Sequence, residues 1–264
     1  MTPSQPAGPR PSLLGVFAHP DDESLLAGGV LAQHAASGAA TAVVTTTWSP
    51  DSHRAPELAE ALAVLGAGDP RLLGFADARV PDSAPGRPRL CDAPIEEVVG
   101  LIVGHVRAVR PRIVVTHDAY GQLTGHPDHV RTHQATVLAF HEAGLEHFRP
   151  DTGEPWRPEV LYAATHPHSG VGELTALLER VGKKVLSVPD EYVTATVDVT
   201  GRSLERKWAA ILSHRSEAAR ERSLPGILAR LPARVRESII ATEYFTRLGT
   251  GAAGPGGGLR ELAV

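Results

Sequence analysis

The chain alternates between short apolar runs and longer stretches in which apolar residues recur every three or four positions. The short runs have the length of buried strands, and the longer stretches are typical of helices with one buried face. Strands are expected at 12–18, 41–47, 71–75, 112–117 and 160–165, and helices at 23–37, 54–66, 95–109 and 126–143. This alternation is typical of βαβ units, and it predicts an α/β, Rossmann-like, mostly parallel sheet flanked by helices.

The pattern after residue 170 is less regular and predicts a small C-terminal extension. A strand is expected at 192–199 and helices at 173–181, 203–222 and 234–247. Because no linker or internal repeat separates this part from the rest, the sequence predicts a single domain over residues 12–247. Residues 1–11 are rich in proline and residues 248–264 in glycine, so both are expected to be flexible termini.

Composition and charge exclude several kinds of partner. Acidic residues outnumber basic ones by 30 to 26, so the chain lacks the basic field that binds a nucleic-acid backbone. No apolar run is long enough to span a membrane, and prolines rather than a basic segment precede the first apolar run. The single cysteine, Cys91, cannot form a disulfide within the chain. We therefore expect a cytoplasmic protein, and the sequence leaves a monomer and a homo-oligomer both open.

Two His-Pro-Asp motifs follow predicted strands. His19-Pro-Asp-Asp-Glu23 comes after the first strand, and His126-Pro-Asp-His129 comes after the fourth. Carboxyl ends of parallel strands meet at one edge of a sheet, so residues of both motifs can converge there. Imidazole and carboxylate ligands suit zinc or iron, and three such ligands with an open position are typical of a hydrolytic zinc site. His126, His129 and His133 share a helical face, and spacing alone does not choose among them.

Each motif also has a purely structural interpretation. Aspartate caps helices, and proline is common in their first turn. Two such motifs at comparable strand ends favour a shared metal site over two unrelated caps. A nucleotide- or sugar-binding module is an alternative, but Gly28 and Gly29 fall inside a predicted helix, where they favour packing over phosphate binding. A non-haem iron oxygenase also uses two histidines and one carboxylate, but it has no need of a second carboxylate such as Asp21.

Three further histidines fall at the same edge of the predicted sheet. His117 ends the fourth strand, and His166 and His168 follow the fifth, so each is a candidate to line a pocket. The irregular, proline-containing segment 76–92 is another candidate, because loops of this length often border functional sites. His214 lies in a predicted helix and is a candidate for the outer wall of the pocket. Core or solvated positions are expected for the other histidines: His34, His53, His105, His141 and His147.

At the two motifs the sequence resembles the LmbE-like (PIG-L) family of zinc-dependent de-N-acetylases. This family includes N-acetylglucosaminyl-phosphatidylinositol de-N-acetylase and the deacetylase and amidase of mycothiol metabolism. The specific matches are Ala18-His-Pro-Asp-Asp-Glu-Ser24 and Gly125-His-Pro-Asp-His-Val-Arg-Thr-His133. Weaker matches at 54–62, 73–77, Lys207 and 214–217 extend the resemblance over residues 12–220.

The resemblance implies a role for individual residues. It implies that the metal, Zn²⁺ with Fe²⁺ as the alternative, is bound by His19, Asp22 and His129. Asp21 is then the general base, and His126 faces the charge that develops on the substrate. Asp21 adjoins a ligand on the same turn but points elsewhere, so it can take a proton from water and return it to the departing amine.

Further residues have supporting roles under the same resemblance. Asp128 can orient a ligand histidine from behind, and His133 can do the same or simply pack. The residues expected to contact the sugar are Arg54, Asp77, Thr124 and His166.

One position departs from the mycothiol-pathway enzymes of this family. They carry a tyrosine two residues before the histidine of the second motif, where this chain has Thr124. The shorter threonine cannot reach an oxyanion over the same distance, and Tyr120 is the candidate substitute. This departure argues against the mycothiol precursor as the substrate.

The sequence therefore predicts a metal-dependent hydrolase that removes an N-acetyl, or another N-acyl, group from an amino sugar or glycoconjugate. The alternatives are an amidase of the mycothiol-conjugate type and a non-haem iron oxygenase that uses the same ligands.

Overall fold

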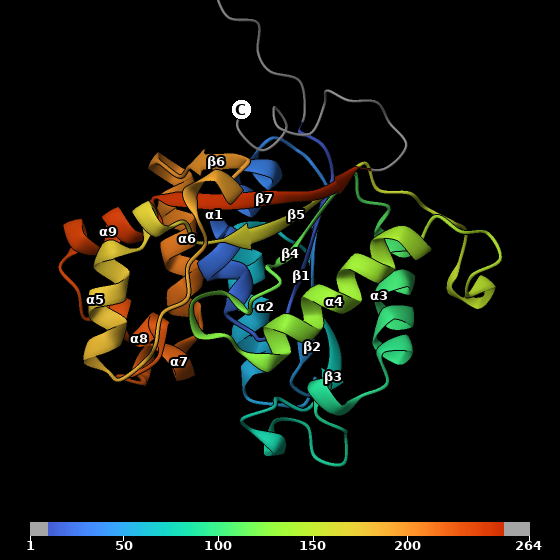
Figure 1. The fold of residues 1–264 in the computed structure, drawn as a ribbon, viewed down its shortest axis with the longest axis horizontal. Helices are drawn as coiled ribbons and strands as arrows, with labels where there is room; N and C mark the ends of the chain where they lie inside the picture. The colour runs from blue at the N-terminus through green and yellow to red at the C-terminus, as the bar shows by residue number, and fades with distance from the viewer. Residues whose placement is uncertain (1–9, 251–264) are drawn as a thin grey trace, which may run out of the picture.

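A seven-stranded sheet forms the centre of the protein in a computed structural model that describes residues 10–250 (Figure 1). Its strands are β1 (Leu13–Phe17), β2 (Thr41–Thr47), β3 (Arg71–Phe75), β4 (Ile113–His117), β5 (Val160–Thr165), β6 (Ala195–Asp198) and β7 (Thr242–Thr250). The strand order is β3-β2-β1-β4-β5-β7-β6. The first five strands are parallel, and β7 is antiparallel to both of its neighbours.

Helices cover both faces of this sheet. They are α1 (Asp22–Ala36), α2 (Arg54–Leu65), α3 (Ile95–Val109), α4 (Pro127–Glu142), α5 (Gly172–Arg180), α6 (Gly201–Ser213), α7 (Arg215–Ala219), α8 (Leu224–Ala229) and α9 (Ala233–Ile240). Short 3₁₀ helices are η1 (Pro81–Ser83), η2 (Leu90–Asp92), η3 (Gln122–Thr124), η4 (Pro150–Thr152), η5 (His168–Gly170) and η6 (Asp190–Tyr192). The predicted α/β fold, a mostly parallel sheet flanked by helices, is confirmed.

The sheet has an apolar core on each side because its central strands are buried on both faces. Along β1, Leu13 and Phe17 join a core with α1, α2 and α6, whereas Leu14 and Val16 join a core with α3 and α4. All four side chains are fully buried. A strand in this position is a continuous apolar run in the sequence.

Two glycines let α1 approach its neighbours closely. A Cβ atom on Gly29 would overlap Val199 Cγ2, and one on Gly28 would lie 3.1 Å from Lys207 Cγ. On β7, the carboxylate of Glu243 accepts hydrogen bonds from the backbone N–H groups of Gly29 and of the next residue, at 2.7 and 2.9 Å. It also pairs with the buried Lys207 ammonium at 2.8 Å. The expectation that these glycines serve packing is confirmed.

The helix expected at 234–247 is wrong beyond Ile240, where α9 ends. The following residues form β7, which pairs with β5 on one side and β6 on the other. Glu243 and Phe245, two residues apart, are both buried. Burial with a period of two suits a strand and not a helix, and pairing with two neighbours satisfies the backbone of β7.

The helix expected at 203–222 is interrupted. It ends at Ser213, and the backbone of His214 leaves the helical region with ψ at 65° before α7 begins. The break turns the His214 ring toward α1, where it meets a carboxylate.

The end of β7 at Thr250 lies past the domain end expected at residue 247. The remainder of the predicted flexible termini, residues 1–9 and 251–264, lies outside the described residues. Within residues 10–250, no helix is both long and apolar enough to cross a membrane.

Candidate active site and metal centre

The two His-Pro-Asp motifs lie side by side at the carboxyl edge of the sheet. The first follows β1 and the second follows β4, and these strands are hydrogen-bonded neighbours. The chain leaves β1 toward β2 on one side, while β4 lies on the other side, so a crevice opens between the loops of β1 and β4. The structure therefore brings both motifs to one site.

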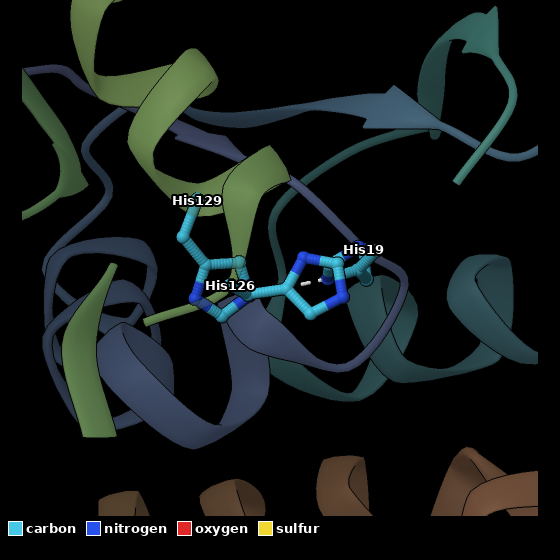
Figure 2. Close-up of side chains that lie close together, drawn as sticks. All are labelled: His19, His126 and His129. Carbon is cyan, nitrogen blue, oxygen red and sulfur yellow. Dashed lines mark hydrogen bonds between the residues drawn. The ribbon is translucent and has the colours of Figure 1, made fainter. Parts of the chain in front are cut away.

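Three side chains from these motifs form a compact cluster. His19 Nδ1 lies 3.1 Å from His129 Nε2 and 3.3 Å from Asp22 Oδ2, and Asp22 Oδ1 lies 3.4 Å from His129 Nε2. Figure 2 shows His19, His126 and His129 gathered at this point, and its dashed line marks the contact between His19 and His129. A tetrahedral zinc ion with ligands at about 2.0 to 2.1 Å separates those ligands by roughly 3.3 Å. The donor types suit zinc. His19 Nδ1 and His129 Nε2 are spaced as two ligands of one ion would be, while Asp22 offers a different oxygen to each ring.

His117 also lies near this cluster, but both of its ring nitrogens have partners. Its Nε2 accepts a hydrogen bond from the Ala18 N–H at 2.8 Å, and its Nδ1 lies 2.9 Å from Gln122 Oε1. The ring stacks on His129 with centroids 4.1 Å apart. His117 therefore packs behind a candidate ligand and does not line the cavity.

Asp128 and Asp77 contact the second ring nitrogen of His19. His19 Nε2 lies 3.2 Å from Asp128 Oδ2 and 3.3 Å from Asp77 Oδ2. Asp128 is fully buried, and its Oδ2 also accepts a hydrogen bond from the Ala78 N–H at 2.9 Å. Burial acts to lower the pKa of His19, but hydrogen bonds to Asp128 and Asp22 outweigh it and raise this pKa to about 10. The two carboxylates hold a proton on Nε2, and a metal ion bound at the cluster would replace the proton on Nδ1.

Asp21 has an unusual backbone conformation at the start of α1. Its φ of 132° lies in a region that side chains rarely adopt. Its carboxylate lines the cavity and lies 3.3 Å from Arg54 Nη2. Burial raises the pKa of Asp21 to about 7, although the Arg54 charge acts to lower it. A carboxyl group that titrates near neutral pH is suited to proton exchange with a bound water.

His126 caps α4 and presents one nitrogen to the cavity. Its Nδ1 accepts a hydrogen bond from the Asp128 N–H at 3.2 Å, so the neutral ring carries its proton on Nε2. Burial, together with the His19 charge, lowers the pKa of His126 to about 4. Its Nε2 lies 3.9 Å from Asp77 Oδ1, which is beyond hydrogen-bond distance. The Nε2–H group can therefore donate to a ligand.

A cavity of about 230 Å³ covers the cluster. The residues expected to contact a substrate all line it: Arg54, Asp77, Thr124 and His166. His133 lies outside this lining, and its Nδ1 is 2.8 Å from the His117 carbonyl oxygen. His168 and Tyr120 also lie outside it, and Tyr120 is 55% exposed. Thr124 thus occupies the cavity wall without help from Tyr120.

Comparison with known proteins identifies the family to which this chain belongs. The family model for GlcNAc-PI de-N-acetylase (PIG-L) matches residues 14–140, which include both motifs. A 1D-myo-inositol 2-acetamido-2-deoxy-alpha-D-glucopyranoside deacetylase from Frankia casuarinae is 33% identical over 98% of this chain and 95% of its own length. The chain belongs to the PIG-L family. The resemblance seen in the sequence is confirmed.

Two further comparisons extend the PIG-L likeness. The deacetylase of the same description from Rhodococcus opacus is 37% identical over 78% of this chain and 81% of its own length. A solved structure, the conserved protein TT1542 from Thermus thermophilus, superposes with a TM-score of 0.61 and 25% identity and covers 90% of this chain and 94% of that one. The likeness to the Frankia enzyme and to TT1542, which covers 98% and 90% of this chain, therefore includes most of the C-terminal extension.

That extension supplies a wall of the cavity that the sequence did not predict. Lys183, Glu217 and Arg220 line it, and Arg79 joins them from the loop after β3. Glu217 pairs with Arg220 at 2.7 Å and lies 3.5 Å from Arg54. Only Glu217 belongs to a segment that the PIG-L resemblance singled out. Arg79 lies in segment 76–92, which the sequence marks as a candidate border of a site, whereas Lys183 and Arg220 lie in loops without a recognisable motif.

Proposed function

We propose that this protein is a zinc-dependent hydrolase that removes an N-acetyl, or another N-acyl, group from the amino sugar of a glycoconjugate. The observation that carries the proposal is the position of Asp21 beside the His19, Asp22 and His129 cluster, with all four residues lining one cavity. The relatives from Frankia and Rhodococcus are named as deacetylases of a 2-acetamido sugar on inositol, which supports the amide of an amino sugar as the bond cleaved.

In this proposal His19, Asp22 and His129 hold the metal ion. A bound zinc ion lowers the pKa of a coordinated water and polarises a substrate carbonyl. Two histidines and one carboxylate also suit Fe²⁺, which is the alternative metal. Asp128 and Asp77 orient His19 for this purpose through its other nitrogen.

Asp21 moves the protons of the reaction. Its carboxylate takes a proton from water as the water oxygen bonds to the acyl carbon. The same carboxyl group then gives that proton to the sugar nitrogen as the carbon–nitrogen bond breaks. The products are the free acid and the free amine. Arg54, at 3.3 Å, favours the ionised form of Asp21 that the first step requires.

His126 stabilises the substrate oxygen. Its Nε2–H faces the cavity and donates to the carbonyl oxygen as that oxygen becomes negative. Thr124 lines the same cavity but has a shorter reach than the tyrosine of the mycothiol-pathway enzymes. His126 is therefore the main donor to this oxygen. The proposed sugar contacts are Arg54, Asp77, Thr124 and His166.

Release of primary amine from a panel of N-acylated sugars tests this function. The panel contains N-acetylglucosaminyl-inositol, a simple N-acetylglucosamine glycoside and a mycothiol-type cysteinyl conjugate. Protein stripped of metal is assayed alone, with Zn²⁺ and with Fe²⁺. We expect amine release that a chelator stops and added metal restores, without oxygen consumption.

The other outcomes separate the alternatives. Cleavage of the cysteinyl conjugate alone would identify an amidase, and oxygen uptake that depends on Fe²⁺ would identify an oxygenase. If the metal-loaded protein turned over no member of the panel, the proposed substrate class would be wrong.

A further inference from the structure

The backbone of Asp21 is held by a buried carboxylate two residues further on. Glu23 Oε2 accepts a hydrogen bond from the Asp21 N–H at 3.0 Å. The other oxygen, Oε1, accepts one from Ser24 Oγ at 2.5 Å and lies 2.7 Å from His214 Nε2. Glu23, Ser24 and His214 are fully buried, and none of them lines the cavity over the candidate metal cluster. They can therefore influence a substrate there only through other residues.

His214 is fixed at the break between α6 and α7. Its carbonyl oxygen accepts a hydrogen bond from the Ala218 N–H at 2.8 Å, which begins α7. Glu57 of α2 holds the same segment, because it accepts hydrogen bonds from the N–H and Oγ of Ser216 at 2.9 and 2.6 Å. The His214 ring thus approaches Glu23 from a rigid position, 191 residues away along the chain.

Asp21 needs such support because of its backbone conformation. A non-glycine residue keeps a φ of 132° only where its surroundings impose it. Its side chain is held separately, since Arg54 contacts the Asp21 carboxylate, the Pro20 carbonyl oxygen and Glu217 of α7. The region around α7 therefore constrains Asp21 in two ways. His214 holds the Asp21 backbone through Glu23, and Glu217 holds the Asp21 carboxylate through Arg54.

We propose that Glu23 and His214 are positioning residues, and that the buried link between them fixes the strained backbone of Asp21 and so the direction of its carboxylate. This inference rests on the proposed role of Asp21 as the general base. A displacement of about 1 Å in such a group can lower a rate by roughly 100-fold.

Substitutions of His214 test the inference with a substrate that the wild-type protein turns over. In His214→Ala we expect kcat to fall by about 10- to 100-fold, with KM and bound metal unchanged. In His214→Gln much of this loss should be recovered, because the amide N–H can donate to Glu23 Oε1. The control is His34→Ala, which removes an equally buried histidine at the other end of α1, where its Nδ1 lies 2.9 Å from the Pro11 carbonyl oxygen. It should keep the wild-type kcat.

The Asp21→Asn background separates positioning from general damage. If His214 acts through Asp21, adding His214→Ala to Asp21→Asn should leave the residual rate unchanged. An equal fold-loss in both backgrounds, or an equal loss of kcat in His34→Ala, would overturn the inference.

Hydrogen exchange gives a readout that does not depend on turnover. The Asp21 amide should exchange about 10-fold faster in His214→Ala than in the wild type, because Glu23, which accepts the hydrogen bond of this amide, is no longer held by His214. Unchanged exchange would also overturn the inference. A metal-loaded wild type without turnover would instead overturn the proposed function.

Discussion

The two His-Pro-Asp motifs share three residues but differ in where the next helix begins. After the first motif, α1 begins at Asp22, so Asp21 is the capping residue and has a φ of 132°. After the second, α4 begins at Pro127, so His126 is the cap, with an ordinary extended backbone at φ −67° and ψ 129°. Asp128 is then already part of the first helical turn.

This difference gives the two aspartates different chemistry. Asp21 lines the cavity, and burial raises its pKa to about 7. Asp128 is fully buried, accepts a hydrogen bond from the Ala78 N–H, and contacts His19 on the side away from the cluster. Identical tripeptides therefore supply one aspartate that can exchange protons and one that orients a ligand. The residue at which the helix begins determines the role of each aspartate.

The largest expected effect is that of Asp21→Asn. Asparagine cannot take a proton, so we expect kcat to fall by about 1,000-fold while the bound metal is retained. His129→Ala is the comparison variant and should lose both activity and metal. Steady-state kinetics and metal analysis on the same preparations check this. Metal content in Asp21→Asn as low as in His129→Ala would mean that Asp21 is a ligand and not the base.

Asp128→Asn should weaken metal binding and leave the proton transfer by Asp21 intact. Loss of the carboxylate behind His19 should weaken metal affinity by roughly 10- to 100-fold. At saturating metal most of the activity should return. Competition with a chelating dye measures the affinity. A loss of kcat that saturating metal does not restore would place Asp128 in the same role as Asp21 and remove the distinction between the motifs.

Arg54→Gln should move the pH dependence of activity. Arg54 acts to lower the pKa of Asp21, so its removal raises that pKa, and the base becomes ionised only at higher pH. The acid limb of kcat/KM should therefore shift to higher pH, with a greater loss of activity at pH 6 than at pH 9. Arg79→Gln changes another arginine of the cavity wall and should leave the limb in place. A shift to lower pH would contradict the proposed pairing.

The smallest expected effect concerns stability. In the metal-free protein, Asp21→Gly should be about 1 kcal/mol more stable than Asp21→Ala, because both variants remove the carboxylate that pairs with Arg54 but only glycine relieves the unfavourable φ. Both variants should be inactive. Asp128→Gly should be destabilising, because it puts glycine into a helix and leaves the Ala78 N–H without its acceptor. Urea unfolding of the three variants measures this. Equal stability of Asp21→Gly and Asp21→Ala would show that the backbone of Asp21 is not strained.

The parallel half of the sheet could be predicted because its signals are local. Leu13–Phe17 is an apolar run buried on both faces, and chemistry-bearing residues follow it directly. The ligand types in the two motifs, together with the rule that strand ends converge, were enough to suggest one shared metal site. The choice of His19, Asp22 and His129 as its ligands came from the resemblance to the PIG-L family.

The rest depends on contacts between distant segments. Thr242–Thr250 is a strand because β5 and β6, far earlier in the chain, pair with it on both sides. Lys183 and Arg220 reach the cavity only when their loops fold over it. The strain at Asp21 was hidden for the same reason, since its tripeptide does not reveal where the helix begins and the support from His214 comes from the other end of the fold.

The contacts of Glu243 have a consequence for the order of events during synthesis. This residue lies in the last strand of the described chain, yet it binds two backbone N–H groups in the middle of α1 and the buried Lys207 of α6. A nascent chain that has left the ribosome only as far as β5 already contains both motifs but lacks this anchor. The helix that carries Asp22 is therefore fixed in place late, and we expect partly synthesised chains to remain inactive until β7 has emerged.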